Sequence, residues 1–116
     1  MTQSIFDSQT FLKSLANDRE LAMELLAAFM EDSPERHSQL GEALAEQDGD
    51  TASKRAHSLK GMCGVVRTGP LVELALGMER SAKEGDLAET GKLYDQFSDL
   101  LVAAHEEIKT FMAAEA

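Results

Sequence analysis

The residues best suited to do chemistry in this sequence lie in the run HSLKGMCG at positions 57–64. In an α-helix, positions three, four and seven places after a residue share its face. Lys60, Gly61 and Gly64 would therefore lie on the same face as His57. Glycine inside a helix costs roughly 1 kcal/mol relative to alanine, so two glycines on one face favour close approach by another large molecule. The pattern indicates a solvent-facing imidazole with a cation one turn away, within reach of another protein.

The segments that must position this histidine have helical periodicity, and no alternating strand pattern occurs in the sequence. On the opposite face of the histidine helix lie small and medium-sized apolar residues, which predict a face packed on the core. These residues are Ala52, Ala56, Leu59, Cys63 and Val66.

Turn and capping signals predict where the helices begin and end. We predict a short opening helix around 6–15, a second over 18–31, and a third that begins at Ser33-Pro34 and ends near Asp48-Gly49. Asp50 is the predicted cap of the fourth helix, which carries His57; Gly69-Pro70 starts the fifth, Gly85 ends it, and Asp86 with Glu89 opens the last. Because the connections are short, the sequence predicts an all-α, antiparallel up-down four-helix bundle with a short extra N-terminal helix or helices.

Length and composition are typical of one soluble domain over 1–116, since 43% of the residues are apolar and 28% are charged. A single cysteine excludes a disulfide framework within the monomer and is typical of a reducing cytosol. No secretory signal and no apolar run long enough to cross a bilayer is visible. We therefore expect a cytoplasmic protein without membrane insertion.

The net charge of −10, from 21 acidic and 11 basic residues, argues against nucleic-acid binding. The basic residues are not spread evenly, because the stretch between Asp50 and Glu73 has no acidic residue. It holds four basic ones, Lys54, Arg55, Lys60 and Arg67. This basic island around His57 favours an anionic ligand or partner, and an ordinary solvated helix is the alternative reading.

The sequence HSLKG at 57–61, followed by small residues, a break and Leu71, resembles the signature of histidine-containing phosphotransfer (HPt) domains. These domains are four-helix-bundle modules of multistep two-component phosphorelays, and the resemblance in helix plan covers nearly the whole chain. It implies that His57 is the phosphoacceptor and that Lys60 is the cation beside the phosphoryl group. It also implies that Gly61 is the open position at which a receiver domain docks.

Two residues of the following helix, Glu79 and Lys83, fall where the family places polar side chains near the histidine. Glu79 could hold the proton of the other ring nitrogen, and Lys83 could offset phosphate charge. An ion pair between these two residues, four places apart on one helix, is the structural alternative. Arg67 stands where many family members have glycine near the end of the histidine helix. The predicted partner-docking residues are Gly61, Gly64, Arg55, Met62 and Arg67.

No phosphate-binding glycine loop and no kinase signature occurs in the sequence. We therefore expect a phosphoryl carrier that has no ATP site, no metal site and no cofactor of its own, and that acts as a monomer. The resemblance implies a partner that supplies the aspartate and Mg²⁺, namely the receiver domain of a response regulator or a hybrid histidine kinase.

Three other classes of small helical protein are alternatives to this one. The main alternative is a helical adaptor that binds a signalling partner through the same face without being phosphorylated. An acyl carrier protein is disfavoured because no Asp-Ser-Leu attachment motif opens a helix, and a metal-binding bundle enzyme because paired Glu-x-x-His motifs do not occur.

Overall fold

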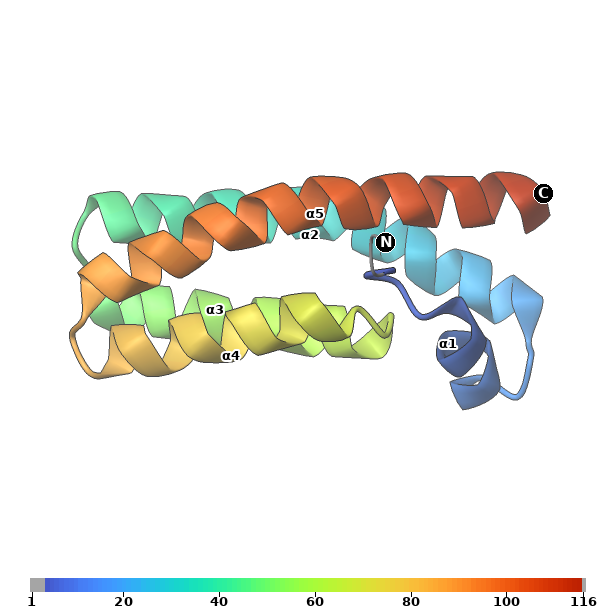
Figure 1. The fold of residues 1–116 in the computed structure, drawn as a ribbon, viewed down its shortest axis with the longest axis horizontal. Helices are drawn as coiled ribbons and strands as arrows, with labels where there is room; N and C mark the ends of the chain where they lie inside the picture. Colours follow the sequence, from blue (N-terminus) through green and yellow to red (C-terminus); the bar gives the residue numbers. More distant parts are fainter. Residues whose placement is uncertain (1–3, 116) are drawn as a thin grey trace.

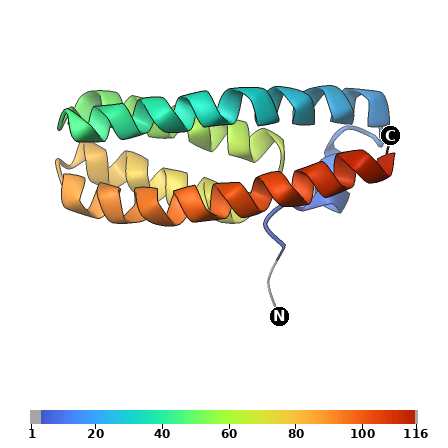
Figure 2. The same ribbon diagram turned by 90° about the horizontal axis from the view of Figure 1, so that it is seen from above.

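The computed structural model describes residues 4–115, which form five α-helices joined by short turns. They are α1 (Ser8–Ser14), α2 (Arg19–Ala45), α3 (Gly49–Val65), α4 (Gly69–Lys83) and α5 (Leu87–Glu115). Helices α2 to α5 run alternately up and down, with α2 beside α5 in one layer and α3 beside α4 in the other (Figures 1 and 2). The predicted antiparallel four-helix bundle with a short extra N-terminal helix is confirmed. The ends of the predicted domain, residues 1–3 and 116, lie outside the described residues.

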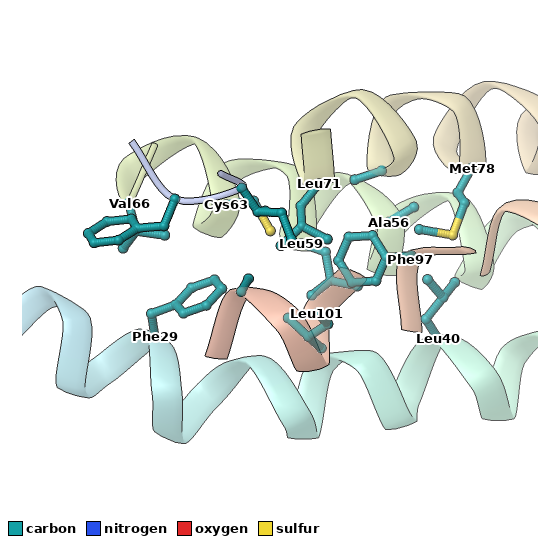
Figure 3. Close-up of a cluster of buried hydrophobic side chains, with 14 of the residues drawn as sticks. Phe29, Leu40, Ala56, Leu59, Cys63, Val66, Leu71, Met78, Phe97 and Leu101 are labelled. Atoms are coloured by element: carbon teal, nitrogen blue, oxygen red, sulfur yellow. The ribbon is translucent and has the colours of Figure 1, made fainter. Parts of the chain in front are cut away.

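The core lies between the two layers and contains the apolar face predicted for the histidine helix. All five residues of that face are buried. Phe97 of α5 is fully buried between the layers, and Figure 3 shows it among side chains from the other three bundle helices. The labelled side chains around it include Leu40 of α2, Leu59 of α3 and Leu71 of α4. Because α3 presents one side to this core, its opposite side must face solvent.

The three turns that join the bundle helices share one plan. In each turn, the residue after the helix C-cap has a left-handed backbone, with φ of 56° at Gln47, 57° at Arg67 and 82° at Gly85. The amide of the following residue donates to a carbonyl five places back, as from Thr68 N to Cys63 O at 3.0 Å. This is the Schellman arrangement that ends helices, and it usually has glycine at the left-handed position. Only the Gly85 turn has the glycine, and Arg67 lies where the resemblance expects one.

The cap of the histidine helix lies two residues before the predicted position. Asp48, and not Asp50, accepts a hydrogen bond from the backbone of Thr51 at 3.1 Å, and Gly49 is the first helical residue. The prediction is wrong because it ends the preceding helix near Gly49, whereas the left-handed residue that ends this helix is Gln47. At α5, the predicted cap is confirmed, since Asp86 accepts from Glu89 N at 3.1 Å.

The predicted break at Ser33-Pro34 does not occur, because α2 continues through Pro34. Proline lacks the N–H that would bond the preceding turn, but packing outweighs this loss here. Phe29, Ser33 and Leu40 lie on one side of α2, and all three are buried. Ser33 Oγ also lies 2.8 Å from Nε2 of His105 on α5. A break after Ser33 would remove one half of this face from the core.

The N-terminal segment closes the end of the bundle where α2 and α5 extend beyond α3 and α4 (Figure 1). Phe6 is buried, and its ring packs against those of Phe11 and Phe111 at centroid distances of 5.6 and 5.5 Å. The backbone N–H of Asp7 donates to the carbonyl of Arg67 at 3.0 Å, which ties this segment to the turn after α3.

Candidate functional site

His57 lies on the solvent face of α3, where 65% of its side chain is exposed. Its exposure follows from the burial of Ala56 and Leu59, which fix the rotation of α3 about its own axis. The ring leans toward the neighbouring helix α4, where Glu79 lies. The predicted solvent-facing position of the imidazole is therefore the one observed.

One carboxylate connects the imidazole to the neighbouring cation. Oε2 of Glu79 lies 3.0 Å from Nδ1 of His57, and Lys60 Nζ donates to Oε1 of the same side chain at 2.7 Å. The hydrogen bond from Lys60, together with that from His57, lowers the pKa of Glu79, so Glu79 is ionised at neutral pH. An ionised carboxylate can only accept. The ring proton of neutral His57 therefore lies on Nδ1, and the lone pair lies on Nε2.

Lys60 is held beside the imidazole rather than extended into solvent, since 27% of its side chain is exposed. The backbone at Glu79 is also anchored, because Ser53 of α3 donates its hydroxyl to the main-chain carbonyl of Glu79 at 3.2 Å. The backbone of α4 is thus fastened to α3 at the residue that holds the ring. These contacts fix the orientation of the His57 ring within the folded protein.

Gly61 and Gly64 lie on the predicted face and leave it bare. A Cβ atom added at either position would meet no atom within 4 Å. Neither glycine is therefore needed for helix packing inside the molecule. Gly41 differs, because an added Cβ there would lie 2.5 Å from the Tyr94 hydroxyl. The two glycines near His57 thus expose α3 to solvent, whereas Gly41 makes room for a neighbouring side chain.

Lys83 lies near the histidine but does not form the predicted alternative ion pair with Glu79, which bonds to His57 and Lys60 instead. A hollow of about 330 Å³ opens between α3 and α4 beside the ring. Its lining comes from Asp50, Ser53, Lys54, His57, Glu79 and Lys83. Two lysines in this hollow provide positive charge beside the imidazole.

The remaining predicted docking residues lie in three different places. Met62 is half-buried and lines an apolar groove of about 150 Å³ between α2 and α3. Arg67 is exposed in the turn after α3 and borders a hollow of about 370 Å³ that also includes Gly64. Arg55 precedes His57 by two positions, so it lies about 200° around the helix from it. The structure does not bring Arg55 onto the His57 face.

Two features of this face were not anticipated from the sequence. Arg36 of α2 donates from Nη1 to the hydroxyl of Ser58 at 2.6 Å, which places a further cation beside the histidine helix. Val65 is 54% exposed at the edge of the apolar groove, whose α2 side is formed by Leu25, Ala28, Phe29 and Asp32. The exposure of Val65 could have been predicted, because it follows Gly61 by four residues and so lies on the same face of α3. The contact of Arg36 with Ser58 depends on α2 being continuous, so no sequence signal gave it.

The other two histidines are half-buried between α2 and α5, away from this face. His37 stacks on Tyr94 with ring centroids 4.6 Å apart and bonds to the Ser98 hydroxyl at 2.7 Å. His105 packs edge-on against Phe29 and bonds to Ser33. Burial lowers the pKa of both imidazoles. Both histidines therefore belong to the packing contact between α2 and α5.

Residues 4–115 contain no cluster of three or more His, Cys, Asp and Glu side chains that could hold a metal ion. Among the same residues, none of the helices is both long and apolar enough to cross a membrane.

Comparison with known proteins gives a family and a fold. The sequence model of the Hpt domain family matches residues 24–109 of this chain. The crystal structure of histidine-containing phosphotransfer protein B (HptB) from Pseudomonas aeruginosa PAO1 is similar with a TM-score of 0.90 and 23% sequence identity, over 97% of this chain and 98% of that one. A search of curated proteins finds no match. At this identity the structural likeness shows the fold, whereas the family match covers well over half of the sequence. The chain therefore belongs to the Hpt domain family, the histidine phosphotransfer modules of phosphorelays.

Proposed function

We propose that this protein carries a phosphoryl group on Nε2 of His57, taking it from one receiver-domain aspartate and delivering it to another. The observation that carries the proposal is the hydrogen bond from His57 Nδ1 to Glu79 Oε2 at 3.0 Å. Because the carboxylate binds the proton on Nδ1, the nucleophilic lone pair lies on Nε2. No described residue bonds to Nε2, and the ring is largely exposed.

The chemistry requires little covalent machinery from this chain. Phosphoryl transfer depends mainly on positioning and on neutralising charge. A neutral imidazole can attack the phosphorus of an aspartyl phosphate through the Nε2 lone pair without first losing a proton. The bond from phosphorus to the aspartate oxygen then breaks, and its electron pair returns to the carboxylate. We propose that Glu79 orients the ring throughout.

Positive charge beside the ring would offset the phosphoryl group. Lys60 has this role in our proposal, because it lies one turn from His57 and is already held by the carboxylate that holds the ring. Lys83 and Lys54, which line the adjacent hollow, would contribute more weakly. Exposed charges interact weakly in water, so their effect should be on transfer kinetics rather than on the stability of the fold.

We propose that the partner is a receiver domain, which docks over Gly61 and Gly64 and contributes the aspartate and Mg²⁺. The bare backbone at both glycines leaves room for a close approach. Val65, Met62 and the adjoining groove offer apolar surface at one end of this face, and Arg36 and Lys60 flank it with positive charge. A receiver's acidic phosphorylation pocket has the complementary charge. The chain would act as a monomer without an ATP site of its own.

The test is transfer from purified receiver domains labelled with ³²P at aspartate. Label should appear on the protein in an acid-labile, base-stable form and should be absent from His57→Gln. His37→Gln and His105→Gln serve as matched controls, since both histidines lie between α2 and α5, and both variants should retain the label. Uptake by His57→Gln, or loss of uptake in either control, would contradict the assignment. ATP alone should give no label.

A second test separates charge from positioning. Lys60→Ala should fold normally but accept the phosphoryl group more slowly and keep it for a shorter time. Lys83→Ala should have a smaller effect of the same sign. Transfer by Lys60→Ala at the wild-type rate would show that this lysine is only part of a solvated helix surface.

A further inference from the structure

We propose that the negative charge of Glu79, and not only its hydrogen bond, sets how readily phosphorylated His57 releases its phosphoryl group. This inference rests on the proposed function, because it concerns the phosphorylated form of the same ring. It goes beyond ring orientation, because a neutral amide at position 79 could accept the same hydrogen bond.

The geometry gives Glu79 direct influence on the ring. Its two carboxylate oxygens have different partners, with Oε2 at 3.0 Å from His57 Nδ1 and Oε1 at 2.7 Å from Lys60 Nζ. The Glu79 side chain is 21% exposed, so water screens its charge less than that of a surface carboxylate. The charge therefore lies next to the ring nitrogen opposite the one that would carry phosphorus.

The charged groups around the ring come from three helices. On α3 and α4 these groups, apart from Glu79 itself, are Asp50, Lys54, Lys60 and Lys83, and α2 contributes Arg36, which bonds to Ser58 beside His57 in the chain. Glu79 is the acidic group among them in contact with the imidazole. The surroundings are otherwise mainly cationic and would oppose a positive charge on the ring. The negative charge of Glu79, in contact with Nδ1, stabilises a positive charge on the ring.

The chemical consequence follows from the electron count. A ring that has phosphorus on Nε2 and a proton on Nδ1 carries a positive charge. When the bond from phosphorus to Nε2 breaks, its electron pair returns to Nε2 and the imidazole leaves as a neutral molecule. If the proton on Nδ1 has been lost, the leaving group would be an imidazolate anion, which leaves far less readily. A carboxylate that stabilises the protonated ring therefore keeps the phosphoryl group transferable to higher pH.

The test compares Glu79→Gln with the wild type after phosphorylation of His57 by phosphoramidate, so that no partner protein is needed. Hydrolysis of the phosphohistidine and its ³¹P chemical shift are followed from pH 6 to pH 9. A unit charge about 4 Å away contributes about 1 kcal/mol even in water, so Glu79→Gln should hydrolyse about fivefold more slowly at the alkaline end. The decline of the rate with pH, and the ³¹P titration, should both move to lower pH.

Two controls isolate the charge at this position. Glu84→Gln removes one carboxylate at the end of the same helix, from an exposed residue, and should match the wild type. The double variant Lys60→Ala/Glu79→Gln, compared with Lys60→Ala, should retain the shift if Glu79 acts on the ring directly. Disappearance of the shift in that comparison would overturn the inference, because the effect would then pass through the lysine.

The outcomes separate the inference from the function on which it rests. A displaced pH profile in Glu79→Gln supports the inference. Superimposable profiles, with His57 labelled normally in both proteins, overturn it and leave the phosphotransfer function intact. If wild-type His57 takes label neither from phosphoramidate nor from any receiver, both proposals fail. Melting curves for each variant establish that the fold is retained.

Discussion

Substitution of Gly61 should separate the stability of the protein from its ability to receive a phosphoryl group. Alanine is a better helix former than glycine by about 1 kcal/mol, and an added Cβ at Gly61 would meet no atom within 4 Å. Gly61→Ala should therefore stabilise the protein by about 1 kcal/mol. For a domain of this size, that corresponds to a rise in melting temperature of about 4 °C.

Gly41→Ala is the matched control, because this residue is also a helical glycine. An added Cβ there would lie 2.5 Å from the Tyr94 hydroxyl and 3.1 Å from Cζ of the same ring. The ring would have to move, although it stacks on His37 and donates to the His37 carbonyl at 3.0 Å. Losing that hydrogen bond and the stacking costs about 1 kcal/mol each. After the gain in helix propensity, Gly41→Ala should be destabilised by about 1 kcal/mol.

Gly61→Gln should move stability and transfer in opposite directions. Glutamine also favours the helix over glycine, so the melting temperature should rise. Its side chain would stand one turn from His57, on the face over which we propose that the receiver domain docks. A misplacement of about 1 Å at the reacting atoms can slow transfer on the order of 100-fold. The assay is transfer from a labelled receiver to His57, measured beside a thermal melt.

Two results would refute this reasoning. Transfer to Gly61→Gln at the wild-type rate would show that the bare helix face is not where the partner docks. A lower melting temperature for Gly61→Ala would show that Gly61 is required for internal packing, contrary to the open space around it.

Three further predictions concern stability and are checked by urea denaturation. Arg67→Gly and Gln47→Gly should each stabilise the protein by about 1 kcal/mol, because both residues have left-handed backbones in which glycine avoids the Cβ clash; a loss of stability in both would contradict this account of the turns. Ser33→Ala should cost about 1–2 kcal/mol, because it removes the buried partner of His105 Nε2, and an unchanged midpoint would mean that water replaces the hydroxyl. Burial holds the pKa of both His37 and His105 below the ordinary value of 6.5, so the unfolded chain binds more protons and stability should fall as the pH drops below about 6.5. The double variant His37→Gln/His105→Gln should lose less stability over that pH range, and an equal loss would assign the acid sensitivity to other groups.

The parts of the site that lie on one helix could be predicted from the sequence. The spacing of His57, Lys60, Gly61 and Gly64 depends only on helical geometry. The apolar face opposite them indicates how the helix is rotated about its own axis, and hence that these residues face solvent. Helical geometry within one element could not predict which side chains contact Glu79. Glu79 could have paired with Lys83 on its own helix, and its actual contacts depend on how α4 lies against α3.

The errors arose where tertiary packing outweighed a local signal. Ser33-Pro34 has the local pattern of a helix start, but burial of Ser33 and its neighbours keeps α2 continuous. Because α2 is continuous, Arg36 reaches Ser58 on α3. The predicted break at Ser33-Pro34 therefore also hid the presence of this arginine beside the histidine helix. Asp48, and not Asp50, caps α3. Gln47 adopts the left-handed backbone conformation that glycine usually takes, so α2 ends before Gly49 and α3 begins there.

The short turn between α3 and α4 has a consequence for how this site can be altered. His57, Lys60 and Glu79 all lie within the contiguous segment 49–83, whose two helices are joined by residues 66–68. By contrast, Arg36 and one wall of the apolar groove belong to α2. The reactive residues and the glycines of the proposed docking face are thus encoded in one stretch of the gene, whereas the α2 part of that surface is encoded in another. Exchange of the α2 surface between homologues should therefore alter the preference among partners while leaving the reactive centre and the bare α3 face unchanged.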